Sequence, residues 1–101
     1  MRALLINPET RSIEEVEVSG RDDIVRLVGY ETIESDEIGP NGDRLFFDEE
    51  CFLRGTTARL QIDSVVPVSG TCVIASANED GSELKDVRST PDTIQARLKY
   101  L

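Results

Sequence analysis

The sequence predicts an α+β fold, in which a mainly antiparallel sheet of about five to seven strands is combined with two helices, the second at the C-terminus. The prediction rests on an apolar opening run, on strand-like segments separated by turn residues, and on two amphipathic segments with helix-boundary residues. A chain of 101 residues is typical of one domain, so we expect a single domain over residues 1–101.

The opening run predicts a strand around which the rest of the chain is arranged. Ala3 to Ile6 are apolar without alternation, which is typical of a strand covered on both faces. Pro8 favours a turn after it, because proline lacks the backbone N–H and disfavours helix at the preceding residue. Val and Glu then alternate toward Val18, so residues 2–6 and 12–18 are predicted to form a hairpin.

Residues 20–28 are predicted to form the first helix. Ile24, Leu27 and Val28 are spaced so that they share one face of a helix. Gly29 follows immediately and is a typical C-terminal stop, because glycine adopts the left-handed conformation without a steric cost.

The middle of the chain alternates strand-like and turn-like segments. Further strands are predicted over residues 30–38, 45–47, 58–63, 71–76 and 82–87, the last of them exposed at a sheet edge. Turn residues cluster at 39–43 and again at 78–81. Cys51 to Leu53 form a short apolar segment, which we expect to be tucked under a loop.

The last residues have the pattern of a second helix that runs to the end of the chain. Thr90 is a good N-cap, and Pro91 occupies the first helical position, where proline is favoured. Ile94, Leu98 and Leu101 recur at helical spacing and would form one apolar stripe.

Several of these segments resemble a family of small proteins of unknown function that is common in phages, plasmids and other mobile elements. The resembling segments are Arg2 to Pro8, Ile13 to Val18, the helix with Ile24 and Leu27, the turn Asn41-Gly42-Asp43, the acids of residues 48–50, the step from Pro67 to Gly70 and the apolar strand after it. The resemblance covers most of the chain and implies a small accessory protein from a mobile element. The family has no agreed activity and offers no catalytic residues to carry over to this sequence, because the shared motifs are turns and core strands.

Composition limits the partners of this protein. The net charge is −9, from 20 acidic and 11 basic residues, so phosphate groups would repel it, and we expect no direct binding to nucleic acid or to a membrane surface. A high-salt or GC-rich source would also produce such an acidic composition. With no long apolar run, no signal-like segment and only two cysteines, the sequence predicts a cytoplasmic protein without a disulfide framework.

The sequence lacks the residues that many catalytic mechanisms need. The absence of histidine excludes Ser-His and Cys-His pairs and histidine metal sites. Cys72 lies in an apolar run, and nothing basic adjoins Cys51, so neither is a candidate nucleophile. The acids of residues 48–50 and 78–81 do not have the spacing of a calcium loop. We therefore predict no catalytic residue, no metal and no cofactor.

The distribution of acidic residues is the remaining feature of the sequence that could indicate a function. Acids near the ends of predicted strands form the candidate binding surface: Glu34, Asp36, Glu37, Asp48, Glu49 and Glu50. Glu14, Glu15 and Glu17 add a further acidic strand. If these strands were neighbours, their outward acids would gather on one face that could imitate the phosphates of duplex DNA.

The sequence therefore predicts a small, acidic, non-catalytic accessory protein that acts by binding another protein. One alternative is a nucleic-acid mimic that inhibits a restriction or CRISPR-type enzyme. A second is a module for a small ligand, which would need a pocket. Self-association through an edge strand is also compatible with the sequence.

Overall fold

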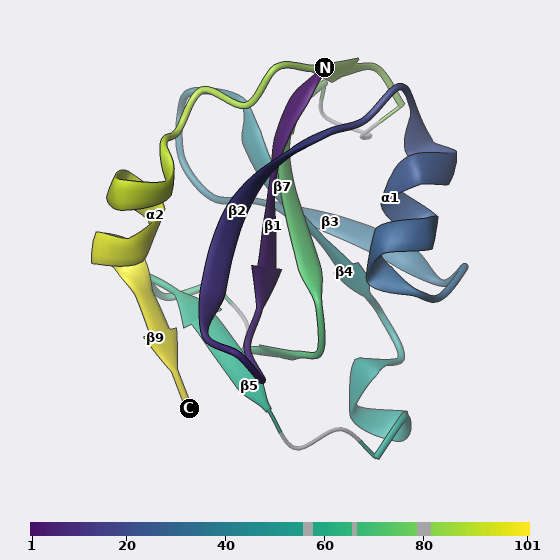
Figure 1. Cartoon of the computed structure of the whole chain (residues 1–101), viewed down its shortest axis with the longest axis vertical. Helices are drawn as coiled ribbons and strands as arrows, with labels where there is room; N and C mark the ends of the chain where they lie inside the picture. The colour runs from purple at the N-terminus through teal and green to yellow at the C-terminus, as the bar shows by residue number, and fades with distance from the viewer. Residues whose placement is uncertain (56–57, 66, 79–81) are drawn as a thin grey trace.

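The computed structural model describes residues 1–55, 58–65, 67–78 and 82–101, which form two antiparallel sheets and two α-helices (Figure 1). The six-stranded sheet contains β1 (Arg2–Asn7), β2 (Ser12–Glu17), β3 (Ile33–Glu37), β4 (Asp43–Asp48), β7 (Cys72–Ala77) and β8 (Leu84–Lys85). The smaller sheet contains β5 (Arg59–Ile62), β6 (Val68–Ser69) and β9 (Leu98–Tyr100). The helices are α1 (Arg21–Val28), α2 (Pro91–Arg97) and the short 3₁₀ helix η1 (Cys51–Leu53). The predicted α+β class is confirmed.

The six-stranded sheet is covered on both faces. One face packs against α1, where Phe46 and Val73 meet Ile24. The other face packs against the smaller sheet and α2, where Ile74 meets a core that includes Leu60. Figure 1 shows α1 on one side of the large sheet and α2 with β9 on the other. These three layers explain why β1 and β7 are apolar without alternation.

The central strand of the large sheet is β7. The strand order is β2-β1-β7-β4-β3, and β8 pairs with the end of β7. The hairpin of β1 and β2 forms as predicted, with Leu4 opposite Glu15. The opening strand β1 is therefore next to the central strand and is not itself central. β7 lies between the hairpins β1–β2 and β3–β4 and pairs with both.

The first helix ends at Val28, as the sequence predicts, and begins at Arg21, one residue later than predicted. Gly29 adopts a left-handed φ of 96°, and its N–H donates to the carbonyl of Val25. At the other end, the carboxylate of Asp23 accepts hydrogen bonds from the N–H and the hydroxyl of Ser19, each at 2.7 Å. These two hydrogen bonds, followed by one from Arg26, lower the pKa of Asp23 to about 2.

The second helix is shorter than predicted. Thr90 caps it and shares a capping box with Thr93, but α2 ends at Arg97. Residues 98–100 instead form β9, which pairs with β5. The prediction of a helix to Leu101 is wrong because β5 offers a free edge, and pairing with it satisfies backbone groups while Leu98 still packs against the core.

Other predicted segments differ in extent. β3 begins only at Ile33, and β8 contains only Leu84 and Lys85. Phe52 and Leu53 are exposed rather than tucked under a loop, although Cys51 is buried. Residues 79–81 of the predicted hairpin turn lie outside the described residues.

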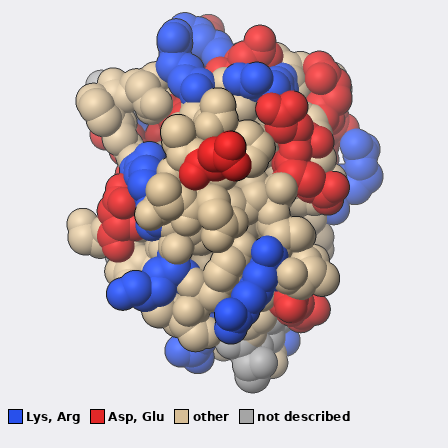
Figure 2. Space-filling model, turned by 60° about the vertical axis from the view of Figure 1, so that its left-hand side comes forward, with Lys and Arg blue, Asp and Glu red and all other residues tan. Residues whose placement is uncertain are grey.

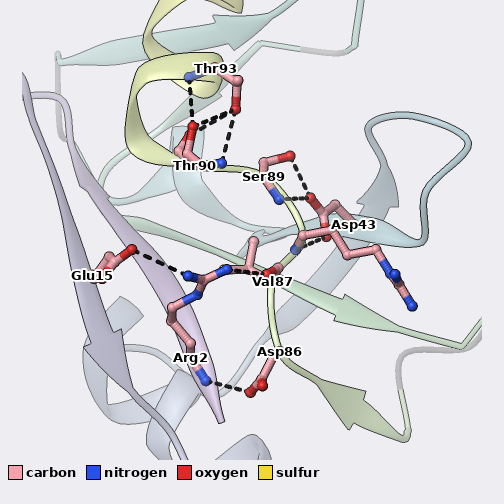
Figure 3. A network of polar contacts seen from close by, with 9 residues as sticks. Arg2, Glu15, Asp43, Asp86, Val87, Ser89, Thr90 and Thr93 are labelled. Carbon is pink, nitrogen blue, oxygen red and sulfur yellow. Dashed lines mark hydrogen bonds and ion pairs between the residues drawn. The ribbon is translucent and has the colours of Figure 1, made fainter.

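Residues 86–89 form a strap that joins β8 to α2 (Figure 3). On one side, the backbone N–H of Arg2 donates to the carboxylate of Asp86, and its guanidinium donates to the carbonyl of Val87 at 2.8 Å. On the other side, the buried carboxylate of Asp43 accepts hydrogen bonds from the N–H groups of Arg88 and Ser89, both at 2.9 Å, and from the Ser89 hydroxyl. The strap thus ties α2 to β1 and β4.

Within the described part of the chain, no helix is both long enough and apolar enough to cross a membrane.

Candidate functional site

The predicted binding acids lie along β3 and in the turn after β4. Glu34 is opposite Phe47, at the end of β3 near this turn, whereas Glu37 is opposite Arg44, toward the other end of the strand. Asp36 lies between them on β3 and is partly buried. Asp48 is the last residue of β4, and Glu49 and Glu50 follow it before η1 begins.

Glu34 and Glu49 are diagonal neighbours across the β3–β4 pair, because the Glu49 N–H donates at 2.7 Å to the carbonyl of Thr32, two residues before Glu34. The side chain of Glu34 is the main reason that the pKa of Glu49 lies above its ordinary value. The charges of Glu50 and Asp48 raise it further. Glu34, Glu49 and Glu50 are all exposed, and we call these three residues the acidic corner. Acids from β3 and from the turn after β4 therefore lie close together, because these two strands pair with each other.

Asp48 is not part of that exposed surface. Only 3% of this residue is exposed, so the prediction of an exposed acid at this position is wrong. Its carboxylate accepts hydrogen bonds from the Arg54 guanidinium at 2.9 Å, from the Thr32 hydroxyl and from the Glu50 N–H. Burial opposes ionisation, but these hydrogen bonds, led by that of Arg54, outweigh it and lower the pKa of Asp48. Asp48 thus supports the turn that presents Glu49 and Glu50.

Next to the acidic corner, η1 presents two apolar side chains. Phe52 is 51% exposed and Leu53 is 80% exposed, and we call this pair the knuckle. Cys51 is buried and holds the helix, since its sulfur accepts a hydrogen bond from the N–H of Ser69. One turn of a 3₁₀ helix has three residues, so its side chains point in three different directions. If the apolar segment of residues 51–53 forms such a turn, only part of it can face the core.

Two arginine side chains lie beside the knuckle, and one of them pairs with a residue of the acidic corner. Arg54 forms ion pairs with Asp48 at 2.9 Å and with Glu50 at 3.4 Å. Its guanidinium also lies 4.1 Å from the centre of the Tyr30 ring. Arg59 lies 5.1 Å from the centre of the Phe52 ring. The guanidinium of Arg54 is thus directed at the supporting carboxylate of Asp48 and at Glu50.

The outer edge of β3 is partly closed to strand pairing. Arg21 donates a hydrogen bond to the carbonyl of Ile33, and Arg44 donates one to the carbonyl of Ser35, each at 2.9 Å. β3 is the last strand of its sheet, so these carbonyls lie at a free edge. Side chains that occupy edge carbonyls and carry charge disfavour the addition of another strand. Contacts at this edge are therefore expected to be made by side chains.

The acids of β2 lie far from those of β3 in the sheet. β2 and β3 are at opposite ends of the strand order, so they are not neighbours. Glu15 lies 3.6 Å from Arg2, and Glu17 lies 2.9 Å from the N-terminal amine. On the face shown in Figure 2, which brings the side of α2 and β9 forward, acidic and basic side chains are interspersed. The condition for one continuous acidic face, that these strands be neighbours, is not met.

The described part of the chain forms a hollow near the turn after β3. Its volume is about 230 Å³, and it is lined by Glu37, Gly39, Pro40, Gly42, Arg44, Ala77 and Asn78. Small-molecule pockets usually measure roughly 300–1,000 Å³. Arg44 is already bound to Ser35, and Asn78 to Ser82 and Glu83. Polar side chains of this hollow are thus occupied by the protein itself.

The structure offers little for metal or thiol chemistry. Among the residues that the structure describes, no group of three or more cysteine, aspartate and glutamate side chains is placed to hold a metal ion. Both cysteines are buried, and burial, with a smaller contribution from Cys51, raises the pKa of the Cys72 thiol. A raised pKa keeps the thiol protonated, and the protonated form is a poor nucleophile.

Replacing Glu49 by glutamine is expected to raise stability at pH 7. The folded-state pKa of Glu49 is raised, so its ionised form destabilises the fold, and this effect disappears as the pH falls below the ordinary glutamate value of about 4.3. Urea unfolding of wild type and Glu49→Gln should therefore show a higher midpoint for the variant at pH 7 and equal midpoints near pH 3.5.

Glu14→Gln on β2 is the control, since it removes one exposed charge outside the acidic corner. Asp48→Asn should behave in the opposite way, because a lowered pKa contributes stability that is present at neutral pH and lost on acidification. If Glu49→Gln were still stabilising at low pH, the effect could not come from the negative charge of Glu49.

No family model, curated protein or solved structure gives a significant match to this chain.

Proposed function

We propose that this protein is a small, acidic, non-catalytic accessory protein that acts by binding a basic surface of another protein through the acidic corner. The observation that carries the proposal is the grouping of three exposed acids at one end of the β3–β4 pair, where Glu34 lies diagonally across from Glu49 and Glu50 follows in the turn. Holding like charges together opposes folding, and side chains that weaken a fold are often retained at functional sites.

A basic partner would relieve this repulsion. Lysine or arginine side chains placed over Glu34, Glu49 and Glu50 would favour the ionised carboxylates and lower the cost of their proximity. Complementary charge also accelerates the encounter of two proteins and excludes partners of the same sign. The remaining predicted acids contribute less in this proposal, since Asp48 is buried and Glu37 lies toward the other end of β3, opposite Arg44.

The two alternatives have weaker support. A mimic of duplex DNA needs acids over an extended face, whereas the acidic strands β2 and β3 lie at opposite edges. A ligand module needs a larger pocket with convergent free polar groups than the hollow beside Arg44 provides. A cytoplasmic setting in a mobile element remains part of the proposal, on the basis of the sequence resemblance and composition.

The proposal is tested by charge removal in two places. The variant Glu34→Gln/Glu49→Gln/Glu50→Gln removes three charges from the acidic corner, and Glu14→Gln/Glu15→Gln/Glu17→Gln removes three from β2. Each tagged protein is used to capture proteins from a lysate of the cells that produce it, and the bound proteins are released by stepwise increases in salt.

We expect the wild type and the β2 variant to capture the same protein at about 0.05 M salt and release it well before 1 M. The corner variant should capture at least about tenfold less of it, since loss of several charge contacts amounts to more than 1.4 kcal/mol. Equal capture by all three proteins would refute a role for the acidic corner. A partner that survives high salt in every case would indicate an apolar interface instead.

A further inference from the structure

We propose that the knuckle is the apolar anchor of this docking surface, and that its occupant is a basic amphipathic segment of the partner protein. Such a segment carries lysine or arginine beside an apolar stripe. The inference rests on the proposed function, because the acidic corner supplies the charged rim. It adds which side chains provide specificity and what chemistry the partner must present.

The first argument is exposure. Leu53 is 80% exposed and Phe52 is 51% exposed, although they are consecutive residues of a short helix. Leu101 is similarly exposed, at 55%, but it is a single side chain outside β9. Burying an exposed leucine or phenylalanine side chain contributes roughly 1.5–3 kcal/mol, so covering the knuckle would contribute substantially to binding.

The second argument is preorganisation. The N–H of Leu53 donates to the Glu50 carbonyl at 2.9 Å, and the N–H of Arg54 donates to the Cys51 carbonyl at 3.3 Å. Cys51 anchors the helix in the core, and the ion pair of Arg54 with Asp48 closes the turn at its base. A surface that is already ordered loses less conformational entropy on binding, so more of the contact energy appears as affinity.

The third argument is charge complementarity. Glu49 and Glu50 directly precede η1, and Glu34 lies diagonally across the β3–β4 pair from Glu49, so an acidic rim adjoins the start of the knuckle. Arg59, 5.1 Å from the centre of the Phe52 ring, contributes one basic side chain beside the knuckle. Aromatic and leucine anchors surrounded by charge select a partner with an apolar stripe and opposite charge. A lysine- or arginine-bearing amphipathic segment meets both requirements.

The same charges disfavour the other occupants of an exposed apolar site. In a symmetric dimer the acidic rim of one copy would face that of the other, in a protein whose net charge is −9. Anionic lipids would be repelled in the same way. Addition of a strand along β3 is disfavoured by Arg21 and Arg44, which occupy carbonyls of its edge. These occupants are outcomes that the experiment below distinguishes.

The test uses two labelled synthetic peptides of about 15 residues with equal positive charge. One has leucine and lysine at helical spacing, and in the other serine replaces every leucine. Binding of each to the purified protein is measured by fluorescence anisotropy at low salt. The proteins are the wild type, Phe52→Ser/Leu53→Ser, the acidic-corner variant of the preceding section, and Leu101→Ser as a control that removes a similarly exposed leucine outside the knuckle, just after β9 and beside Arg59.

We expect the wild type and Leu101→Ser to bind the leucine peptide about tenfold more tightly than the serine peptide. Phe52→Ser/Leu53→Ser should bind both peptides equally, at the affinity of the serine peptide. The acidic-corner variant should lose affinity for both peptides. In NMR spectra of the wild-type protein, the backbone amide signals that shift when the leucine peptide is added should belong to residues 49–54.

Two outcomes separate the two proposals. If the acidic-corner variant binds both peptides weakly but Phe52→Ser/Leu53→Ser keeps the tenfold preference, the knuckle is not the anchor and the acidic corner stands. If the preference depends on the knuckle while the acidic-corner variant binds normally, the proposed function fails instead. Concentration-dependent sedimentation of the wild type that Phe52→Ser/Leu53→Ser abolishes would assign the knuckle to a second copy and overturn the basic partner.

Discussion

Replacing Asp43 by asparagine is expected to lower the free energy of unfolding by about 3 kcal/mol. The Asp43 carboxylate is fully buried and accepts hydrogen bonds from two backbone N–H groups and one hydroxyl of Arg88 and Ser89. An amide of the same shape has only one acceptor oxygen, and its NH₂ group would face donors. At least one buried donor would then lose its partner, because Ser89 is buried and its donors cannot bind water instead.

Urea unfolding at pH 7 measures this effect, and Asp86→Asn is the matched control. Asp86 lies in the same strap, but it is exposed and accepts one hydrogen bond from the N–H of Arg2. Its replacement should change stability by no more than about 0.5 kcal/mol. If Asp43→Asn were as mild as Asp86→Asn, the carboxylate would not hold the strap.

Replacing Phe46 by alanine is expected to have the larger effect, a loss of about 4 kcal/mol. Phe46 is buried between the sheet and α1, in the cluster that contains Ile24 and Val28. It lies on β4 opposite Val73 of the central strand, so its removal leaves a cavity that a sheet paired on both sides cannot easily fill.

Phe52→Ala provides the control, since it makes the same chemical change on the half-exposed ring of the knuckle. We expect this variant to unfold within about 0.5 kcal/mol of wild type. That outcome would also show that substitutions in the knuckle leave the fold intact. A large loss of stability at Phe52, equal to that at Phe46, would mean that the ring supports the core and would weaken its assignment as an anchor.

Local patterns in the sequence were sufficient for most elements of the fold. Pro8 and Gly29 end their elements as predicted, because proline and glycine act through their own backbone restrictions. The apolar runs of β1 and β7 are buried on both faces, as continuous runs predict. Thr90 and Pro91 begin α2 because the cap and the first helical turn depend on adjacent residues.

Features that depend on partners distant in the sequence were not predictable in this way. Leu98 and Leu101 have helical spacing, yet the chain enters β9, since the edge of β5 is supplied by a segment about 40 residues earlier. Asp43 has the appearance of a turn residue in the sequence, and only the fold brings it to the strap.

The candidate site shows the same division between sequence and tertiary structure. The acidic composition, the lack of histidine chemistry and the acids at residues 34 and 48–50 can be read from the amino-acid sequence. The pairing of β3 with β4, which places Glu34 near Glu49, the burial of Asp48 and the position of β2 at the other edge of the sheet appear only in the folded protein. The physical reason is that charge and local conformation belong to each residue, whereas burial and the distance between two carboxylates depend on the pairing of strands that are distant in the chain.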